Sequence, residues 1–173
     1  MGQREIAAAV HAAIDYLNAN PGEARYTDSP ATATLHDPQA LAVDVTGPQD
    51  ARITTDMPTS VGGANGAVSP GWYLRAAAAS CVATLIAMRA AQLGVSLTSV
   101  RVTVDSESDD RGILGADPTV PGGPLSTRVA AQVTGTANHQ ELTAIVNWAV
   151  EHCPVTDAVR RAIPVTVEVQ TTD

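Results

Sequence analysis

Residues Pro70–Gly94 read PGWYLRAAAASCVATLIAMRAAQLG, and this stretch decides how the chain folds. Pro70 suits the first turn of a helix, where its missing N–H has no helical partner, and Gly94 suits the left-handed residue that ends a helix. The residues between them are mostly Ala and Leu, which form helices readily. Because the run Ala76–Met88 carries no charge, the sequence predicts a helix that is apolar nearly all round and therefore buried.

This helix is not expected to span a membrane, since Arg75 and Arg89 bound its uncharged part at 13 residues, below the roughly 18 that a span needs. The formal net charge is −8 and no cluster of basic residues is present, so nucleic acid and anionic membranes are poor partners. Glu5 and Asp15 interrupt the N-terminal apolar stretch, which excludes a signal peptide. We therefore expect a cytoplasmic protein, whose two cysteines are reduced core thiols or redox-active thiols.

The remaining periodicity predicts an α+β fold with mostly antiparallel sheets. An amphipathic helix, short strands, a second helix, a short third helix and a last strand surround the central helix. The helices are expected near residues 3–19 and 138–150, with a short helix that ends at about residue 161. The strands are expected near residues 31–35, 41–45, 52–55, 100–104, 125–134 and 164–170. The core must be built from small aliphatic side chains, because only 3% of residues are aromatic, and this favours an oligomer that buries further surface.

Two loops carry weak ligand signals. Residues 56–69 are rich in glycine before a helix, but they have neither the lysine of a Walker motif nor GxGxxG spacing. In Asp105–Pro124 the acidic residues alternate as in a calcium loop, yet Asp110 stands where the EF-hand needs glycine and no glutamate closes the loop. A solvated connection is the better interpretation of both, and we expect no metal and no cofactor.

Covalent chemistry therefore rests on Cys81 and Cys153. They are 72 residues apart, which is neither CxxC nor zinc-finger spacing, and the histidines are scattered. Cys153 precedes Pro154 and should cap the short helix, where a thiolate is favoured. Cys81 lies in the middle of an apolar helix, where burial raises the pKa of a thiol. It could react only if a cation such as Arg52 or Arg25 reached it, and otherwise it is an inert core residue.

The pattern SPGWYLRAAAASC, followed by a long apolar helix, HCPV and a last strand, resembles the osmotically inducible protein C and organic hydroperoxide resistance (OsmC/Ohr) family. The lead-in DMPTSVGG is also similar to that family. The resemblance covers roughly Arg25 to Thr171. It implies an OsmC-like domain at residues 23–173, with residues 1–22 as an N-terminal helix extension.

The resemblance implies a thiol-dependent peroxidase that reduces organic hydroperoxides. Cys81 would attack the peroxide as a thiolate and become a sulfenic acid, which Cys153 would resolve as a disulfide. A dithiol, either a small molecule or a lipoyl protein, would then reduce the disulfide. The family fold is an intertwined homodimer with active sites near the subunit interface. In the family pattern a glutamate ten residues before the first cysteine holds an arginine over the thiolate, and this chain has Gly71 there.

A second hypothesis keeps the fold and drops the catalysis. The missing carboxylate at Gly71 and the adjacent aromatic pair Trp72-Tyr73 favour a dimeric protein that binds an apolar small molecule, with inert or redox-sensing thiols. A reactive Cys81 of low pKa favours the enzyme, and a Cys81 that resists alkylation favours the binding protein.

Overall fold

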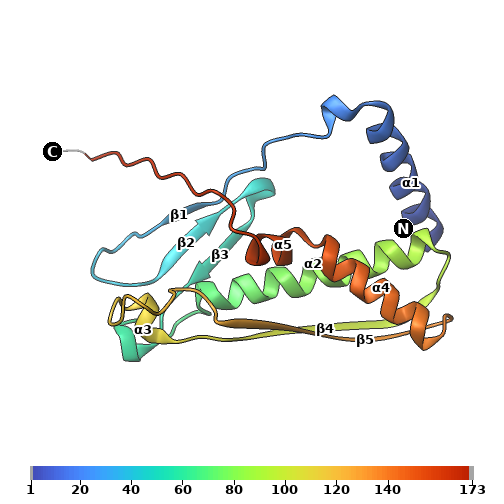
Figure 1. Cartoon of the computed structure of the whole chain (residues 1–173). Helices are drawn as coiled ribbons and strands as arrows, with labels where there is room; N and C mark the ends of the chain where they lie inside the picture. The colour runs from blue at the N-terminus through green and yellow to red at the C-terminus, as the bar shows by residue number, and fades with distance from the viewer. Residues whose placement is uncertain (1, 172–173) are drawn as a thin grey trace.

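The central helix lies along a long two-stranded hairpin, and a second helix crosses it (Figure 1). The structure is a computed structural model that describes residues 2–171. Within those residues the helices are α1 (Gln3–Ala19), α2 (Pro70–Gln92), α3 (Asp110–Ile113), α4 (His139–His152) and α5 (Pro154–Arg160). The strands are β1 (Thr32–Thr34), β2 (Val43–Thr46), β3 (Arg52–Thr55), β4 (Leu97–Glu107) and β5 (Ser126–Gly135), and short 3-10 turns lie at Pro21–Glu23, Pro48–Asp50 and Thr59–Val61.

Both sheets are antiparallel, as the sequence predicts. β1, β2 and β3 pair in that order, with Val45 opposite Ile53, and β4 pairs with β5 over nearly its whole length, with Val102 opposite Ala131. Strand β4 continues to Glu107, so the predicted loop at 105–124 is shorter than expected and contains α3. The result is an α+β arrangement in which helices cover one face of the β4–β5 hairpin (Figure 1).

Helix α2 begins and ends where its sequence predicts. Ser69 is the N-cap, its Oγ accepts the backbone N–H of Trp72 at 3.3 Å, and Pro70 follows as the first helical residue. Gly94 has a φ of 69°, the left-handed conformation that costs glycine little. The helix is long and apolar enough to cross a membrane by length and composition alone. It nevertheless packs on β4, α4 and α1, as the core helix of the fold does.

One face of α2 is buried, so the prediction of a helix buried nearly all round was wrong. Its fully covered residues are Ala78, Val82, Ile86, Ala90 and Ala91. Val82 and Ile86 form the core with Ile145 and Ala149 of α4, and the valines of β4 and β5 pack beneath them. The rest of the helix is only partly covered within the single chain, and near its start Trp72 and Leu74 remain 46% and 41% exposed.

The C-terminal strand was also predicted wrongly for the single chain. Residues 164–170 form no strand, and they run away from the body of the molecule (Figure 1). The alternating Val165, Val167 and Val169 are 77–82% exposed. Their alternation is typical of a strand, but within residues 2–171 this segment pairs with neither of the two sheets.

Candidate active site

The fold brings the two cysteines together although 72 residues separate them in the sequence. Cys81 lies in the middle of α2, and Cys153 lies at the junction of α4 and α5. Cys81 packs against the core cluster that contains Cys153, and each thiol shifts the pKa of the other.

Cys153 is held by the turn that it caps. Its sulfur accepts the backbone N–H of Thr156 at 3.5 Å, and Thr156 Oγ1 donates to the carbonyl of Val150 at 2.7 Å. Helix α4 leads to this turn from a capping box, in which Asn138 and Glu141 exchange backbone-to-side-chain bonds of 3.0 Å. The predicted cap Cys153 is therefore confirmed, and Asn138 is the N-cap of α4.

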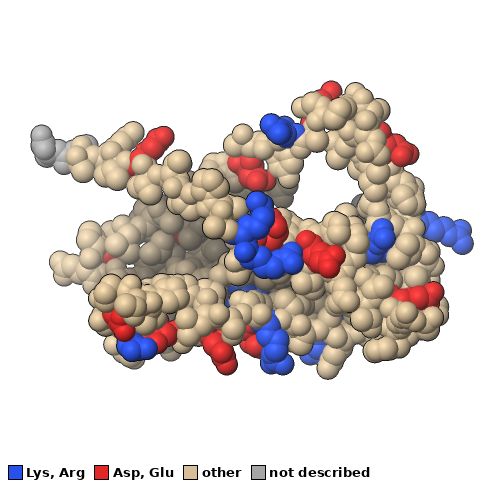
Figure 2. Space-filling view, in the orientation of Figure 1, with Lys and Arg blue, Asp and Glu red and all other residues tan. Residues whose placement is uncertain are grey.

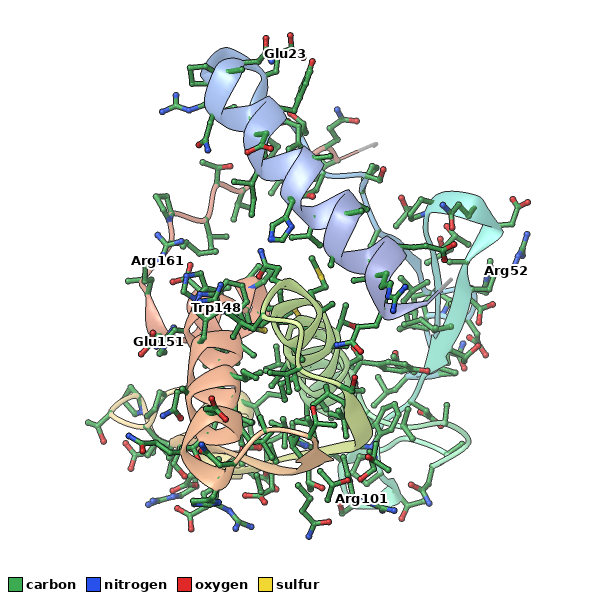
Figure 3. All side chains as sticks on the ribbon, turned by 90° about the vertical axis from the view of Figure 1, so that its right-hand side faces the viewer. Glu23, Arg52, Arg101, Trp148, Glu151 and Arg161 are labelled. Carbon is green, nitrogen blue, oxygen red and sulfur yellow. The ribbon has the colours of Figure 1, made fainter. Side chains whose placement is uncertain are left out.

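A stack of side chains fixes the end of α4 next to Cys153. The Trp148 and His152 rings are stacked with centroids 4.1 Å apart, and the Arg89 guanidinium lies 4.8 Å from the Trp148 centroid. Figure 3 shows Trp148 at the end of α4 that faces α2. The stack joins α2 to α4 next to Cys153, and its Arg89 lies eight residues after Cys81 on α2.

The pKa values of the two thiols diverge in the way the sequence predicts. Burial would raise the pKa of Cys153, but the N–H groups of Thr156 and Val155 and the Cys81 thiol donate to its sulfur and lower the pKa below its ordinary value. Burial, together with the hydrogen bond and the charge of Cys153, raises the pKa of Cys81 to about 11. Cys153 is therefore the first of the pair to ionise.

Access favours the other thiol. Cys153 is 0% exposed and belongs to the hydrophobic core, whereas Cys81 is half-buried. A substrate approaching the pair within this chain therefore meets Cys81 first. The thiol that ionises first is therefore buried, and the accessible thiol is the one with the raised pKa.

No arginine of residues 2–171 makes a hydrogen bond or ion pair with either sulfur. Arg52 lies on β3 and points away from α2 (Figure 3), and Arg25 is exposed in the segment that follows α1. Neither of these predicted cations reaches Cys81 within the single chain. Arg75, on α2 itself, points toward the start of the helix, because its Nη1 lies 3.7 Å from the place a Cβ would take at Gly71.

The glycine-rich loop is fixed around a buried carboxylate. Asp56, 3% exposed, accepts the backbone N–H groups of Met57, Ala64 and Gly66 at 2.7, 3.2 and 2.8 Å. These bonds hold the pKa of Asp56 below its ordinary value. A Cβ at Gly63 would lie 1.8 Å from the carbonyl oxygen of Met57, so only glycine fits there. The loop delivers the chain to the start of α2 in a fixed conformation.

The acidic loop uses its carboxylates internally. Asp105 pairs with Arg128 at 2.6 Å, and Asp109 pairs with Arg111 at 2.5 Å. Residues 2–171 hold no group of three His, Cys, Asp or Glu side chains arranged to bind a metal ion. The carboxylates therefore tie the loop to β5 and α3.

Two cavities lie along α2 toward its N-terminus. The inner cavity, about 130 Å³, lies between α2, the β4–β5 hairpin and α5, and its lining includes Leu74, Ala78, Val104, Val129 and Thr156. The outer groove, about 500 Å³, extends from it between the loops around residues 57–61 and 108–124. Thr156 connects the inner cavity to the site, because its N–H binds Cys153.

The sequence analysis missed the role of Thr156 and the meeting of Arg75 with Gly71. Thr156 follows the capping cysteine by three residues, and that spacing is the signal for a capping bond. Arg75 follows Gly71 by four residues, the spacing at which helical side chains meet.

Comparison with known proteins places the chain in a family. A family model described as OsmC-like protein matches residues 62–168, which include both cysteines. Among curated proteins none matches the sequence.

Solved structures share the fold. An organic hydroperoxide resistance protein OsmC of Legionella pneumophila is 25% identical, with a TM-score of 0.61 over 79% of this chain and 91% of that chain. An OsmC-like protein of Mycoplasma pneumoniae is 14% identical, with a TM-score of 0.64 over 79% and 89%. An organic hydroperoxide resistance protein of Elizabethkingia anophelis is 17% identical, with a TM-score of 0.60 over 79% and 91%. The chain has the fold of these proteins, and the extent of the family match shows that it belongs to the OsmC/Ohr family.

Proposed function

We propose that the protein is a thiol-dependent peroxidase that reduces organic hydroperoxides through Cys81 and Cys153. The observation that carries the proposal is the packing of Cys81 against the core cluster that contains Cys153, because these two thiols come from distant parts of the sequence and shift one another's pKa. Membership of the OsmC/Ohr family supports a peroxide-related function, and structural neighbours are organic hydroperoxide resistance proteins.

In this mechanism Cys81 is the attacking sulfur because it is the accessible one, and it reacts as a thiolate after its proton has left to solvent. The Cys81 sulfur attacks one peroxide oxygen, the O–O bond breaks, and the alkoxide leaves and is protonated to an alcohol. Cys81 then carries a sulfenic acid.

The second half-reaction regenerates the pair. The Cys153 sulfur attacks the Cys81 sulfenic acid, and hydroxide leaves and takes the Cys153 proton to become water. A disulfide between the two residues remains, and an external dithiol, either a small molecule or a lipoyl protein, reduces it by thiol exchange. The reaction needs no metal or cofactor, because the electrons come from the dithiol.

The active unit in this proposal is a homodimer in the cytoplasm. The partly covered surface of α2 and the exposed valines of residues 164–170 are apolar surfaces that a second subunit would bury. A partner would also supply charge near Cys81, whose pKa is too high for an efficient thiolate in the isolated chain. The N-terminal helix extension, residues 1–22, then adds to the OsmC-like domain of residues 23–173.

Peroxide consumption tests the assignment. Cumene hydroperoxide and hydrogen peroxide are supplied with a dithiol to the wild type, Cys81→Ser and Cys153→Ser. We expect turnover with the organic peroxide, its complete loss in Cys81→Ser, and overoxidation of Cys81 in Cys153→Ser, seen as added oxygen by mass spectrometry. Turnover that persists in Cys81→Ser would contradict the roles.

A second function has one observation in its favour, the raised pKa of Cys81 with no arginine beside it. In that case the protein is a non-catalytic or redox-sensing dimer that binds an apolar small molecule. Absence of turnover in the wild type, together with a Cys81 that resists alkylation at neutral pH, would favour it.

A further inference from the structure

Arg75 is a cation inside an apolar environment without an acidic partner. Its side chain is half-buried and lines both the inner cavity and the outer groove. Its Nη1 donates to Ser106 Oγ at 3.3 Å, a neutral acceptor. Among the described residues no carboxylate lies within ion-pair distance of this guanidinium.

The nearby acidic groups do not neutralise it. Asp109 and Asp110 line the outer groove, but Asp109 is bound to Arg111 and Asp110 forms no ion pair with Arg75. Arg160 also lines the inner cavity, yet it donates to the Glu151 carbonyl at 3.2 Å and lies close to Asp157, whose pKa its charge helps to lower. Figure 2 shows basic and acidic side chains mixed on the surface around α5. Arg75 is therefore the better candidate for binding an external anion.

Gly71 leaves room beside the guanidinium. It lies one helical turn before Arg75, and a Cβ there would be 3.7 Å from Nη1, an ordinary contact distance. A larger side chain with a carboxylate would reach Arg75 and pair with it. Because glycine has no side chain, the N–H donors of the Arg75 guanidinium remain accessible from the outer groove, where a ligand group can approach them.

The inner cavity beyond Arg75 determines the size of the apolar part that a ligand can have. Its lining is mainly aliphatic, and its volume of about 130 Å³ is close to that of an engineered apolar cavity, about 150 Å³, which holds a benzene molecule. A body of about six carbons therefore fits between Leu74, Val104 and Val129. Thr156, which also lines the cavity, donates its N–H to Cys153, so one residue separates the cavity from that thiol.

We propose that Arg75 is a specificity-determining residue that binds the carboxylate of an amphipathic ligand whose apolar part fills the inner cavity. As far as it concerns substrates, the proposal rests on the proposed function, in which case the preferred peroxide is a carboxylated hydroperoxide. The carboxylate accepts two N–H bonds from the guanidinium fork, and the apolar body replaces water in the cavity.

Binding of an unreactive pair of ligands tests the site apart from catalysis. Hexanoate and 1-hexanol are titrated into the reduced protein by calorimetry. We expect hexanoate to bind more tightly, and Arg75→Gln to weaken hexanoate by about tenfold or more, since a charged hydrogen-bonded pair is lost, with little effect on hexanol. Arg75→Lys should retain part of the affinity, because the charge remains without the fork.

Gly71 supplies the sharper test because it leaves Arg75 in place. Gly71→Glu should pair with Arg75 and abolish the preference for hexanoate, whereas the isosteric Gly71→Gln should retain it. Arg101→Gln serves as the charge-matched control, since Arg101 is exposed on β4 and lines neither cavity (Figure 3). Equal hexanoate affinity in the wild type, Arg75→Gln and Gly71→Glu, or no binding of hexanoate, would overturn the proposal.

Turnover separates this inference from the proposed function. Cumene hydroperoxide is compared with its para-carboxylated derivative, and Arg75→Gln should raise KM for the carboxylated peroxide only, with kcat retained. If the wild type turns over neither peroxide but hexanoate binding still depends on Arg75, the peroxidase proposal fails and the anion site stands. If both peroxides turn over with KM values that Arg75→Gln does not change, the peroxidase stands and the anion site fails.

Discussion

At the scale of single residues, the unusual feature is a pair of thiols whose unequal environments shift their pKa values in opposite directions. Cys153 receives backbone donors and Cys81 receives none that outweigh its burial. The order in which the thiols ionise depends on their interaction, because each thiol shifts the pKa of the other. Removing either one should therefore move the pKa of the survivor in a known direction.

Cys153→Ala should lower the pKa of Cys81 from about 11, because the hydrogen bond and the charge that raise it are gone. Cys81→Ala should raise the pKa of Cys153, because one of the donors to its sulfur is lost. The chemical shift of the cysteine Cβ carbon in selectively labelled protein, followed against pH, reports each thiol separately. Shifts in the same direction in both variants would show that the thiols do not interact.

At the scale of elements, stability is concentrated where α2 crosses α4. Ile86 and Ile145 are the largest side chains that are fully buried, and both lie at this crossing. Other surfaces of α2 contribute less within one chain, because they are only partly covered. A truncation at the crossing should therefore cost far more than one at the end of the helix.

Ile86→Ala should lower the free energy of unfolding by about 2–5 kcal/mol, through lost burial and a residual cavity. The control is Leu93→Ala at the end of the same helix, where the side chain is 53% exposed and the change should cost about 0.5 kcal/mol or less. Urea unfolding followed by circular dichroism measures both variants. Equal losses would contradict a core placed at the α2–α4 crossing.

The sequence predicts those elements whose signals are local. Ser69 and Pro70 begin α2 and Asn138 caps α4, because these residues bond to backbone within one turn of themselves. The meeting of Cys81 with Cys153 could not be predicted in this way, because it depends on how α2 packs against α4. It entered the sequence analysis through family resemblance only. The buried face of α2 was also hidden, since a helix of alanines shows no clear stripe.

At the scale of the whole molecule, the single chain leaves apolar surface exposed to solvent. The C-terminal residues 164–170 have the alternation of a strand but lie in the open, so the sequence pattern describes a pairing that the chain alone does not make. The error in the strand prediction is therefore informative. An alternating valine segment without a neighbour is explained if its neighbour belongs to another subunit.

Deleting residues 164–173 should convert the proposed homodimer into a monomer, because the segment loses its pairing with the partner. Sedimentation velocity measures the change, and peroxide turnover is followed in parallel. The control replaces Thr166 and Glu168, which alternate with the valines, by serine and glutamine, and should leave the dimer intact. A wild type that sediments as a monomer would contradict the dimer proposal.

The capping bond of Cys153 has an evolutionary consequence. The same sulfur that takes part in the proposed chemistry also caps α5 by accepting the Thr156 N–H. Selection for catalysis and selection for helix stability therefore act on the same position. Among N-cap residues, Ser, Thr, Asp and Asn replace one another at small cost, whereas Ala does not. In a relative that has lost the thiol chemistry, we expect serine at this position and not alanine, because serine can still cap α5.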